Sequence, residues 1–447
     1  MSKTTIDLLQ KASSSSINAK LYCKSFILPN FTFSTFYQNY SSEIKKTLKN
    51  IYIKQEVSQK LQDLLTGKII NHSEKRAALH HYYRNREHKN TGFDLIQAIE
   101  VLQKKIIREK YQNIFIFGIG GSFEGPRILF EALSLSKNLN TYFITGPDKD
   151  EFNSIVKPRL AGKNLYLFAS KSFTTDETML TYSWLPKNIS RQHFFAITSN
   201  PYQAKILNFL EENILFFPET IGGRYSIWSP ISAIVLDKKS ANAFLRGGKV
   251  IDDSIKGGQS VLKAIQEVVF YDLWSSNFLN KSNRAILAYN WKLRSLHSYF
   301  QQLEMESLGK QPASNSIFQK TGQTVYGGFG STAQHSYFQL LHQGTSDTVV
   351  DIVHAKSSSS KLLNSQALGQ AKLLSGKIKQ KKGRNAVNGN IPVNYFKLNK
   401  IGAESLGSLI AFWEYRVFVT ATMLEINPFD QFGVNAGKEV TQKIFKK

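Results

Sequence analysis

The sequence has a single cysteine, Cys23, among 447 residues. One thiol excludes a disulfide within the chain and a zinc site built from several thiolates. The residues that follow Met1 lead into no apolar segment of the kind that signal peptides carry. Because a free thiol suits a reducing compartment, these features predict a cytoplasmic protein.

The sequence also lacks a long, uncharged apolar run. The nearest candidate, residues 406–426, carries Glu414 and Arg416 near its middle. Charges at that depth are costly in a bilayer but are tolerated in a protein core when they are paired. We therefore predict a buried helix at 406–426 and no membrane partner.

Acidic residues are few, with 33 Asp and Glu against 57 Lys and Arg, for a net charge of +24. Such an excess suits an anionic partner, whether nucleic acid, an acidic membrane or a phosphorylated metabolite. It is also typical of a lysine-rich composition that leaves solvated lysines over the whole surface. The basic residues are scattered, and their densest group has no aromatic residue between them, so we predict no nucleic-acid partner.

The chain does contain a glycine-rich turn in the stretch 113–133. An apolar run, 114–117, stops at Gly118-Ile119-Gly120-Gly121-Ser122, and an apolar-periodic segment opens after Pro126. A strand, a turn and a helix in this order bare successive N–H groups at a helix N-terminus, which favours a bound phosphate. Phe123 stands where a dinucleotide fingerprint needs glycine, and no Gly-Lys-Ser/Thr follows for a P-loop. The alternative is an ordinary tight turn.

Short apolar runs recur after this turn, separated by polar or helical stretches. They lie at 141–144, 164–169, 194–198, 213–217, 324–326 and 348–353. This alternation indicates parallel sheets covered by helices, so we predict an α/β protein of two doubly wound lobes. We predict a long helical region over residues 260–308, and short helical segments in the polar first 90 residues.

Hydroxyl and basic side chains follow the predicted strand 164–169, in the sequence Ser170-Lys171-Ser172-Phe173-Thr174-Thr175. Ligands of open α/β sheets bind at the carboxyl ends of the strands, and a phosphate needs donors and a positive charge. The alternative is that these hydroxyls only cap a loop.

Three further residues are candidates for chemistry. Arg224 follows two glycines, an arrangement that suits the stabilisation of a developing oxyanion; it could equally be a surface arginine. Glu306 ends a predicted helix, where the helix dipole disfavours its charged form and suits it to act as a base. His335 opens a predicted helix, seven residues before His342 and too far from it to share a metal. An ordinary solvated glutamate and a structural histidine are the alternatives, and no metal site is expected.

Six segments occur in order along the chain: GIGGSFEGP, SKSFTTDET, GGRYSIWSP, MESLGK, QHSYFQLLHQGT and INPFDQFGVNAGK. Over about residues 70–440 this series resembles the phosphoglucose isomerase family. The resemblance implies two sugar-isomerase (SIS) lobes, each a mainly parallel sheet flanked by helices, with an N-terminal helical segment. We expect the N-terminal segment at 1–95, the first lobe at 96–245 and the second lobe at 246–447.

The resemblance implies reversible isomerisation of D-glucose 6-phosphate and D-fructose 6-phosphate through a cis-enediol, in glycolysis and gluconeogenesis, without a cofactor. The residues that match sugar-phosphate binders are Gly121, Ser122, Ser170, Lys171, Ser172 and Thr175. Glu306 matches the base that moves the proton, and Arg224 matches the group that stabilises the enediolate. Lys438 and His335 match the pair that assists ring opening, and Gln431 matches a contact to the sugar.

In the family the histidine reaches the site from the partner subunit, so the resemblance implies a homodimer. The chain departs from the family in the loop 327–333, where Gly-Glu-Pro-Gly-Thr-Asn-Gly is usual, and at Leu308, Ser172 and Ile391, which replace Asn, Thr and Arg. It is also shorter than the long relatives whose C-terminal tail embraces the partner. Each position with a chemical role still holds a competent residue.

Three other hypotheses fit parts of the sequence. A related isomerase with wider specificity would also accept mannose 6-phosphate. A sugar-phosphate sensor without catalysis would bind the same ligand but would need neither Glu306 nor Lys438. A nucleic-acid binder would use the charge of +24, but no recognition motif accompanies that charge.

Overall fold

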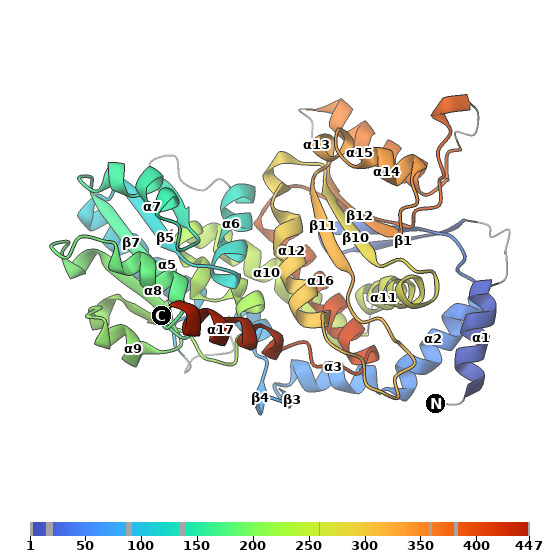
Figure 1. The fold of residues 1–447 in the computed structure, drawn as a ribbon, viewed down its shortest axis with the longest axis horizontal. Coiled ribbons are helices and arrows are strands. Elements are labelled where there is room, and N and C mark those ends of the chain that lie inside the picture. Colours follow the sequence, from blue (N-terminus) through green and yellow to red (C-terminus); the bar gives the residue numbers. More distant parts are fainter. Residues whose placement is uncertain are drawn as a thin grey trace.

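The computed structural model describes residues 3–14, 21–85, 92–133, 139–258, 260–356, 360–379 and 383–445. The chain forms two α/β lobes that stand next to each other (Figure 1). The first lobe, in cyan and green, and the second, mostly yellow and orange with the blue N-terminal strands, each contain one large sheet. The domain boundaries near residues 95 and 245 stay a prediction.

The first lobe contains a parallel sheet with the strand order β6-β5-β7-β8-β9. Its strands are β5 (Asn113–Phe117), β6 (Asn140–Ile144), β7 (Asn164–Ala169), β8 (Phe194–Thr198) and β9 (Ile214–Phe216). Its helices are α5 (Leu95–Glu109), α6 (Gly121–Leu133), α7 (Lys149–Ile155), α8 (Asp176–Ser183) and α9 (Pro201–Ile206). Every residue of β5, β7 and β8 is buried, as expected of strands covered on both faces. The predicted strand–turn–helix at 113–133 is confirmed.

The second lobe contains a mixed sheet with the order β1-β2-β13-β12-β10-β11. Its strands are β1 (Tyr22–Leu28), β2 (Phe31–Tyr37), β10 (Asn283–Ala288), β11 (Thr324–Phe329), β12 (Thr348–Ala355) and β13 (Val393–Leu398). The last four run parallel, whereas β1 and β2 are antiparallel to their neighbours. The strands predicted at 324–326 and 348–353 are confirmed.

Two sequence expectations missed strands of this sheet. The predicted helical region 260–308 is divided by β10, which lies between β12 and the edge strand β11. The N-terminal segment holds the expected helices α1 (Lys3–Ser14), α2 (Ser42–Lys54), α3 (Val57–Leu65) and α4 (His80–Asn85), but also the β1–β2 hairpin and a short hairpin of β3 (Ile69–Asn71) and β4 (Arg76–Ala77). A Pro29-Asn30 turn, with Asn30 at φ 69°, joins β1 to β2, and the aromatic residues of β2 pack into the core.

Three long helices pack against one another: α10 (Lys238–Lys256), α11 (Ser260–Phe278) and α16 (Ala403–Met423). Almost every residue of α16 is buried, which confirms the buried helix predicted there. α16 packs against α10 at very short range, because a Cβ at Gly247 or at Gly407 would overlap a backbone carbonyl of the other helix. Within the described part of the chain, no helix is long and apolar enough to cross a membrane.

The remaining helices of the second lobe are α12 (Leu296–Leu308), α13 (Gly330–Gln334), α14 (Phe338–Gln343) and α15 (Lys361–Leu374), and α17 (Asn435–Phe445) follows near the end of the chain. α12 contacts both α6 and the 3-10 helix η4 (Gly223–Trp228) of the first lobe. α12 therefore meets the turn at the carboxyl end of β5 and the segment that follows β9. α17, dark red in Figure 1, is an exposed helix with no buried residue.

Candidate active site

The glycine turn after β5 forms one wall of the candidate site. Gly120 has φ 59°, a backbone conformation that glycine adopts without strain, and α6 starts at the next residue. Gly121 lies directly against the start of η4, because a Cβ there would overlap the carbonyl oxygen of Gly223. Ser122 follows in the first turn of α6, where helix N–H groups and the dipole favour an anion.

The segment 170–175, after β7, forms a second wall. The Ser170 and Thr175 hydroxyls are 2.9 Å apart and hydrogen-bonded to each other. The Phe173 N–H donates to Ser170 Oγ, and Phe173 has φ 55°, so the loop turns back on itself. Ser172 is exposed, and its Oγ accepts from the Thr174 N–H and hydroxyl. These hydroxyls lie close together after β7, and their role as phosphate donors stays a prediction.

Lys171 carries the positive charge of this cluster. Its Nζ donates to the carbonyl oxygen of Glu219 at 2.7 Å. Burial lowers the pKa of Lys171 to about 8, and the nearby charge of Arg76, with a smaller effect from Arg224, acts in the same direction. A bound dianion would favour the ammonium form, so this lysine is suited to a phosphate.

Arg224, in η4, is buried and uses all five of its N–H donors. Its Nε donates to Ser307 Oγ at 2.8 Å, and Nη2 donates to the backbone carbonyls of Pro428 and Asp430. Its Nη1 donates to Glu306 Oε2 at 3.2 Å and to Gln431 Oε1 at 2.8 Å. The guanidinium therefore joins the end of α12 to the segment after α16.

Glu306, in the last turn of α12, is the carboxylate of this site. Its side chain is 30 % exposed, so a ligand can reach it. Oε1 accepts from Gln302 Nε2 at 3.2 Å, one helical turn earlier. Gln302 also lies beside the glycine turn, because a Cβ on Gly120 would come 3.0 Å from its Nε2. We did not select Gln302 from the sequence, although its i, i+4 spacing from Glu306 places both on one face of the helix.

The structure thus brings Gly121, Arg224, Glu306 and Gln431 together, with the cluster at 170–175 near enough for Arg224 to act on the Lys171 charge. The site lies between the lobes, at the carboxyl ends of β5 and β7. That is the edge at which open α/β sheets bind ligands.

His335 lies elsewhere. α12 runs antiparallel to β11, since Gln301 bonds Val325 while His297 lies beside Gly327. Glu306 therefore lies beyond the first residue of β11, whereas His335 follows the last residue of β11. The rise per residue of a helix and a strand places Glu306 and His335 about 20 Å apart. His335 is exposed, and its side chain has no hydrogen-bond or ion-pair partner among the residues that the structure describes.

Lys438 lies in α17, exposed to solvent. Its side chain likewise makes no hydrogen bond or ion pair with any described residue. The structure therefore does not place either of the two residues matched to ring opening in contact with the Arg224–Glu306 pair. Their roles stay a prediction.

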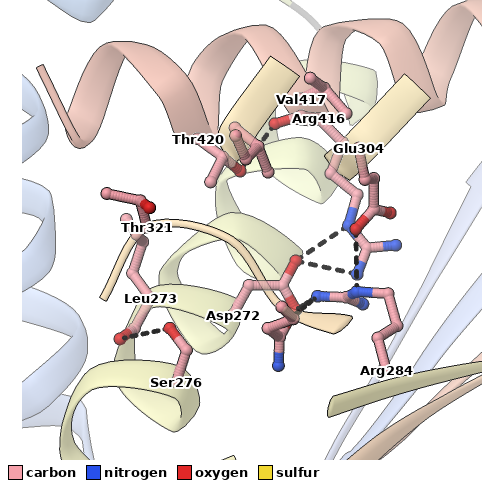
Figure 2. A pocket seen from close by; sticks show the side chains of 11 residues that line it. Asp272, Leu273, Ser276, Arg284, Glu304, Thr321, Arg416, Val417 and Thr420 are labelled. Carbon is pink, nitrogen blue, oxygen red and sulfur yellow. Dashed lines mark hydrogen bonds and ion pairs between the residues drawn. The ribbon is translucent and has the colours of Figure 1, made fainter. Parts of the chain in front are cut away.

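The opposite face of α12 borders a small enclosed cavity of about 20 Å³ (Figure 2). Asp272 points towards Arg284 and Arg416 there, and Glu304 forms an ion pair with Arg284 at 3.1 Å. Burial, the largest influence, raises the pKa of Glu304, although both arginines oppose this shift. This cavity is too small for a sugar and its charges are paired, so it belongs to the scaffold.

The departures from the family pattern lie outside the Arg224–Glu306 pair. Leu308 is buried and lines the cavity behind α12, and Ile391 is buried in the core of the second lobe. The altered loop 327–333 forms the end of β11 and the helix α13. Gly330 is needed there, because a Cβ would overlap the ring of Tyr289. Among the described residues, no three His, Cys, Asp or Glu side chains gather as a metal site would require.

A family model described as phosphoglucose isomerase matches residues 35–447. The chain belongs to the phosphoglucose isomerase family. A glucose-6-phosphate isomerase of Legionella pneumophila (strain Paris) is 34 % identical over 425 residues, which cover 87 % of this chain and 84 % of the relative. A glucose-6-phosphate isomerase of Buchnera aphidicola is 31 % identical over 482 residues, covering 96 % and 88 %.

Solved structures agree on the fold. The crystal structure of a glucose-6-phosphate isomerase from Chlamydia trachomatis has a TM-score of 0.82 and 23 % identity, and covers 99 % of this chain and 95 % of that one. A hypothetical protein from Thermus thermophilus has a TM-score of 0.72 at 18 % identity, covering 95 % and 100 %. The expected two-lobed phosphoglucose isomerase fold is therefore confirmed.

Proposed function

We propose that this member of the phosphoglucose isomerase family interconverts D-glucose 6-phosphate and D-fructose 6-phosphate in the cytoplasm. One observation carries the proposal. A reachable carboxylate, Glu306, faces a buried guanidinium, Arg224, at 3.2 Å, between the lobes and beside a cluster of hydroxyls and a lysine. Proton transfer next to a carbonyl needs that combination of a base, a stabiliser of negative oxygen and an anchor for the phosphate.

The phosphate would bind the first lobe. Ser122, Ser170, Ser172 and Thr175 would supply hydroxyl donors, the backbone at Gly121 an N–H, and Lys171 a charge. In the bond between Ser170 and Thr175 only one hydroxyl donates, so the hydrogen of the other hydroxyl stays available to a phosphate oxygen. Fixing the phosphate would set carbons 1 and 2 of the sugar over Glu306, and such positioning supplies a large part of the rate.

Glu306 would then move a proton between carbons 1 and 2 through a cis-enediol. Arg224 would stabilise the negative oxygen that develops. Because every N–H of Arg224 already has an acceptor, a substrate oxygen would replace one of the side-chain acceptors on Nη1, Glu306 or Gln431. Gln431 and Gln302 are exposed enough to contact the sugar as this exchange takes place.

The ring must open before the proton moves, and we assign this step to Lys438 and His335. Within one chain His335 lies about 20 Å from Glu306, so the proposal requires the histidine of a second subunit. A homodimer with twofold symmetry would supply one such histidine to each site.

The function is tested by a coupled assay that converts fructose 6-phosphate to glucose 6-phosphate in the presence of EDTA. We expect robust turnover, since the proposed chemistry moves a proton with protein groups alone. Phosphosugar binding without turnover would instead favour the non-catalytic sensor.

The dimer is tested by mixing two inactive variants, Glu306→Gln and His335→Ala, after separate purification and subunit exchange. A mixed dimer contains one intact site, built from the native Glu306 of one chain and the native His335 of the other. An equal mixture should therefore recover about a quarter of wild-type turnover. Recovery that stays at the level of the separate variants would contradict a shared site.

A further inference from the structure

Lys310 follows the end of α12 and closes it. Its Nζ donates to the backbone carbonyl of Glu306 at 2.9 Å and to that of Ser307 at 2.8 Å. The last carbonyls of a helix have no partner within the helix, and an ammonium group satisfies them and offsets the helix dipole. Lys310 therefore binds the peptide group of the residue that carries the base.

Lys310 also reaches the segment after α16. Its Nζ lies 3.6 Å from the carboxylate of Asp430, which in turn accepts from the Ser73 hydroxyl at 2.7 Å. The backbone carbonyl of the same Asp430 accepts from Arg224. Asp430 is thus bound by the lysine at the end of α12 and by the arginine of the site.

We propose that Lys310 is a positioning residue, which fixes the end of α12 to Asp430 and so holds Glu306 at its distance from Arg224. The inference rests on the proposed isomerase function, and it adds a residue that touches neither the substrate nor the reacting atoms. Without Lys310 the last turn of α12 loses two carbonyl bonds and its ion pair. A base displaced by about 1 Å can cost about 100-fold in rate.

Three charged groups face Lys310: Glu306 from α12, Arg224 from η4, and Asp430 from the segment after α16. The pKa of Lys310 is lowered to about 8, chiefly by burial and also by the charge of Arg224, while Asp430 and Glu306 oppose this shift. The ammonium group is therefore present below about pH 8 and is lost above it. We expect kcat to fall as pH rises through this range.

The test compares Lys310→Met and Lys310→Arg with Lys320→Met, a matched control at an exposed lysine in the same connecting segment. Lys310→Met should lower kcat about 100-fold with KM changed less than about threefold. Lys310→Arg should restore kcat to within about tenfold of wild type and move the alkaline limb to higher pH, because a guanidinium keeps its charge. Lys320→Met should match wild type.

A second variant keeps the test valid if Lys310→Met fails to fold. Asp430→Asn removes a carboxylate that raises the pKa of Lys310, so its alkaline limb in kcat should move to lower pH. The inference on Lys310 would be overturned if Lys310→Met had the kcat of wild type. It would also be overturned if the alkaline limb of kcat did not move in either Lys310→Arg or Asp430→Asn. In both cases an active wild-type enzyme would leave the proposed function intact. An inactive wild type would overturn both.

Discussion

Two carboxylates of α12, Glu304 and Glu306, form ion pairs of almost equal length and have different surroundings. Glu304 lies 3.1 Å from Arg284 and Glu306 lies 3.2 Å from Arg224. Two positions along a helix are about 200° apart, so the side chains leave opposite faces of α12. Glu304 is 6 % exposed and Glu306 is 30 % exposed.

The two glutamates also differ in the partners of their ion pairs. Arg284 also pairs with Asp272 and Asp351, and Trp413 donates to the other oxygen of Glu304, so this pair is closed on every side. Glu306 shares Nη1 of Arg224 with the exposed Gln431, an acceptor that a ligand can replace. An ion pair alone therefore does not distinguish the two carboxylates; access and an exchangeable partner make Glu306 the candidate.

The largest expected effect is a difference in kcat between variants of the two carboxylates. Glu306→Gln should lower kcat about 10³-fold, because an amide cannot take the proton, and should leave phosphosugar binding near that of wild type. Glu304→Gln, the matched change on the other face of α12, should keep kcat within about tenfold of wild type under conditions in which the variant is folded. Coupled assays at saturating fructose 6-phosphate measure both variants. Near-normal turnover in Glu306→Gln would remove it from the proposed role.

The same two variants should rank in the opposite order in stability. Glu304→Gln leaves Arg284 with one charge partner fewer in the core, and a broken buried pair costs about 3 kcal/mol of unfolding free energy. Glu306→Gln should change it by less than about 1 kcal/mol, since its pair is partly exposed. Urea unfolding followed by tryptophan fluorescence is a suitable measurement, because Trp413 is bonded to Glu304. Equal midpoints for the two variants would break the comparison.

Sequence patterns were sufficient for elements whose own residues determine them. The buried strands β5 and β7 are predominantly apolar runs, β12 is an apolar run interrupted by Asp351 and His354, and the glycine turn after β5 was evident from Gly118 to Gly121. β10 was missed because NRAILA is short and lies between two strongly helical segments, and its place in the sheet depends on long-range pairing with β11 and β12.

The local motifs of the site could be predicted from the sequence, but the contacts between its distant segments could not. The residues of the glycine turn and of the loop at 170–175 were evident as local motifs. Sequence could not show that Arg224 uses every donor, that Lys310 binds the carbonyl of Glu306, or that His335 follows the end of β11 away from Glu306. Those facts depend on contacts between segments that are distant in the chain.

The smallest expected effect compares the two lysines whose pKa values lie near 8, Lys171 in the phosphate wall and Lys310 behind the base. Burial depresses the pKa of Lys171, so its ammonium form is present below about pH 8 and is lost above it. The phosphate of the substrate stays a dianion throughout this range, since its second pKa is about 6. Loss of one charged donor should therefore raise KM by about tenfold between pH 7.5 and 9.5.

Steady-state KM and kcat across this pH range distinguish the two lysines. The rise in KM should disappear in Lys171→Arg, which keeps its charge, while the fall of kcat that we assign to Lys310 remains. A KM that stays flat to pH 9.5 in the wild type would mean that the Lys171 charge contributes little to phosphate binding and that the hydroxyls dominate. A bound dianion favours the ammonium form of Lys171, so loss of this proton occurs in the free enzyme and changes KM. Lys310 lies behind the base, so loss of its proton changes kcat.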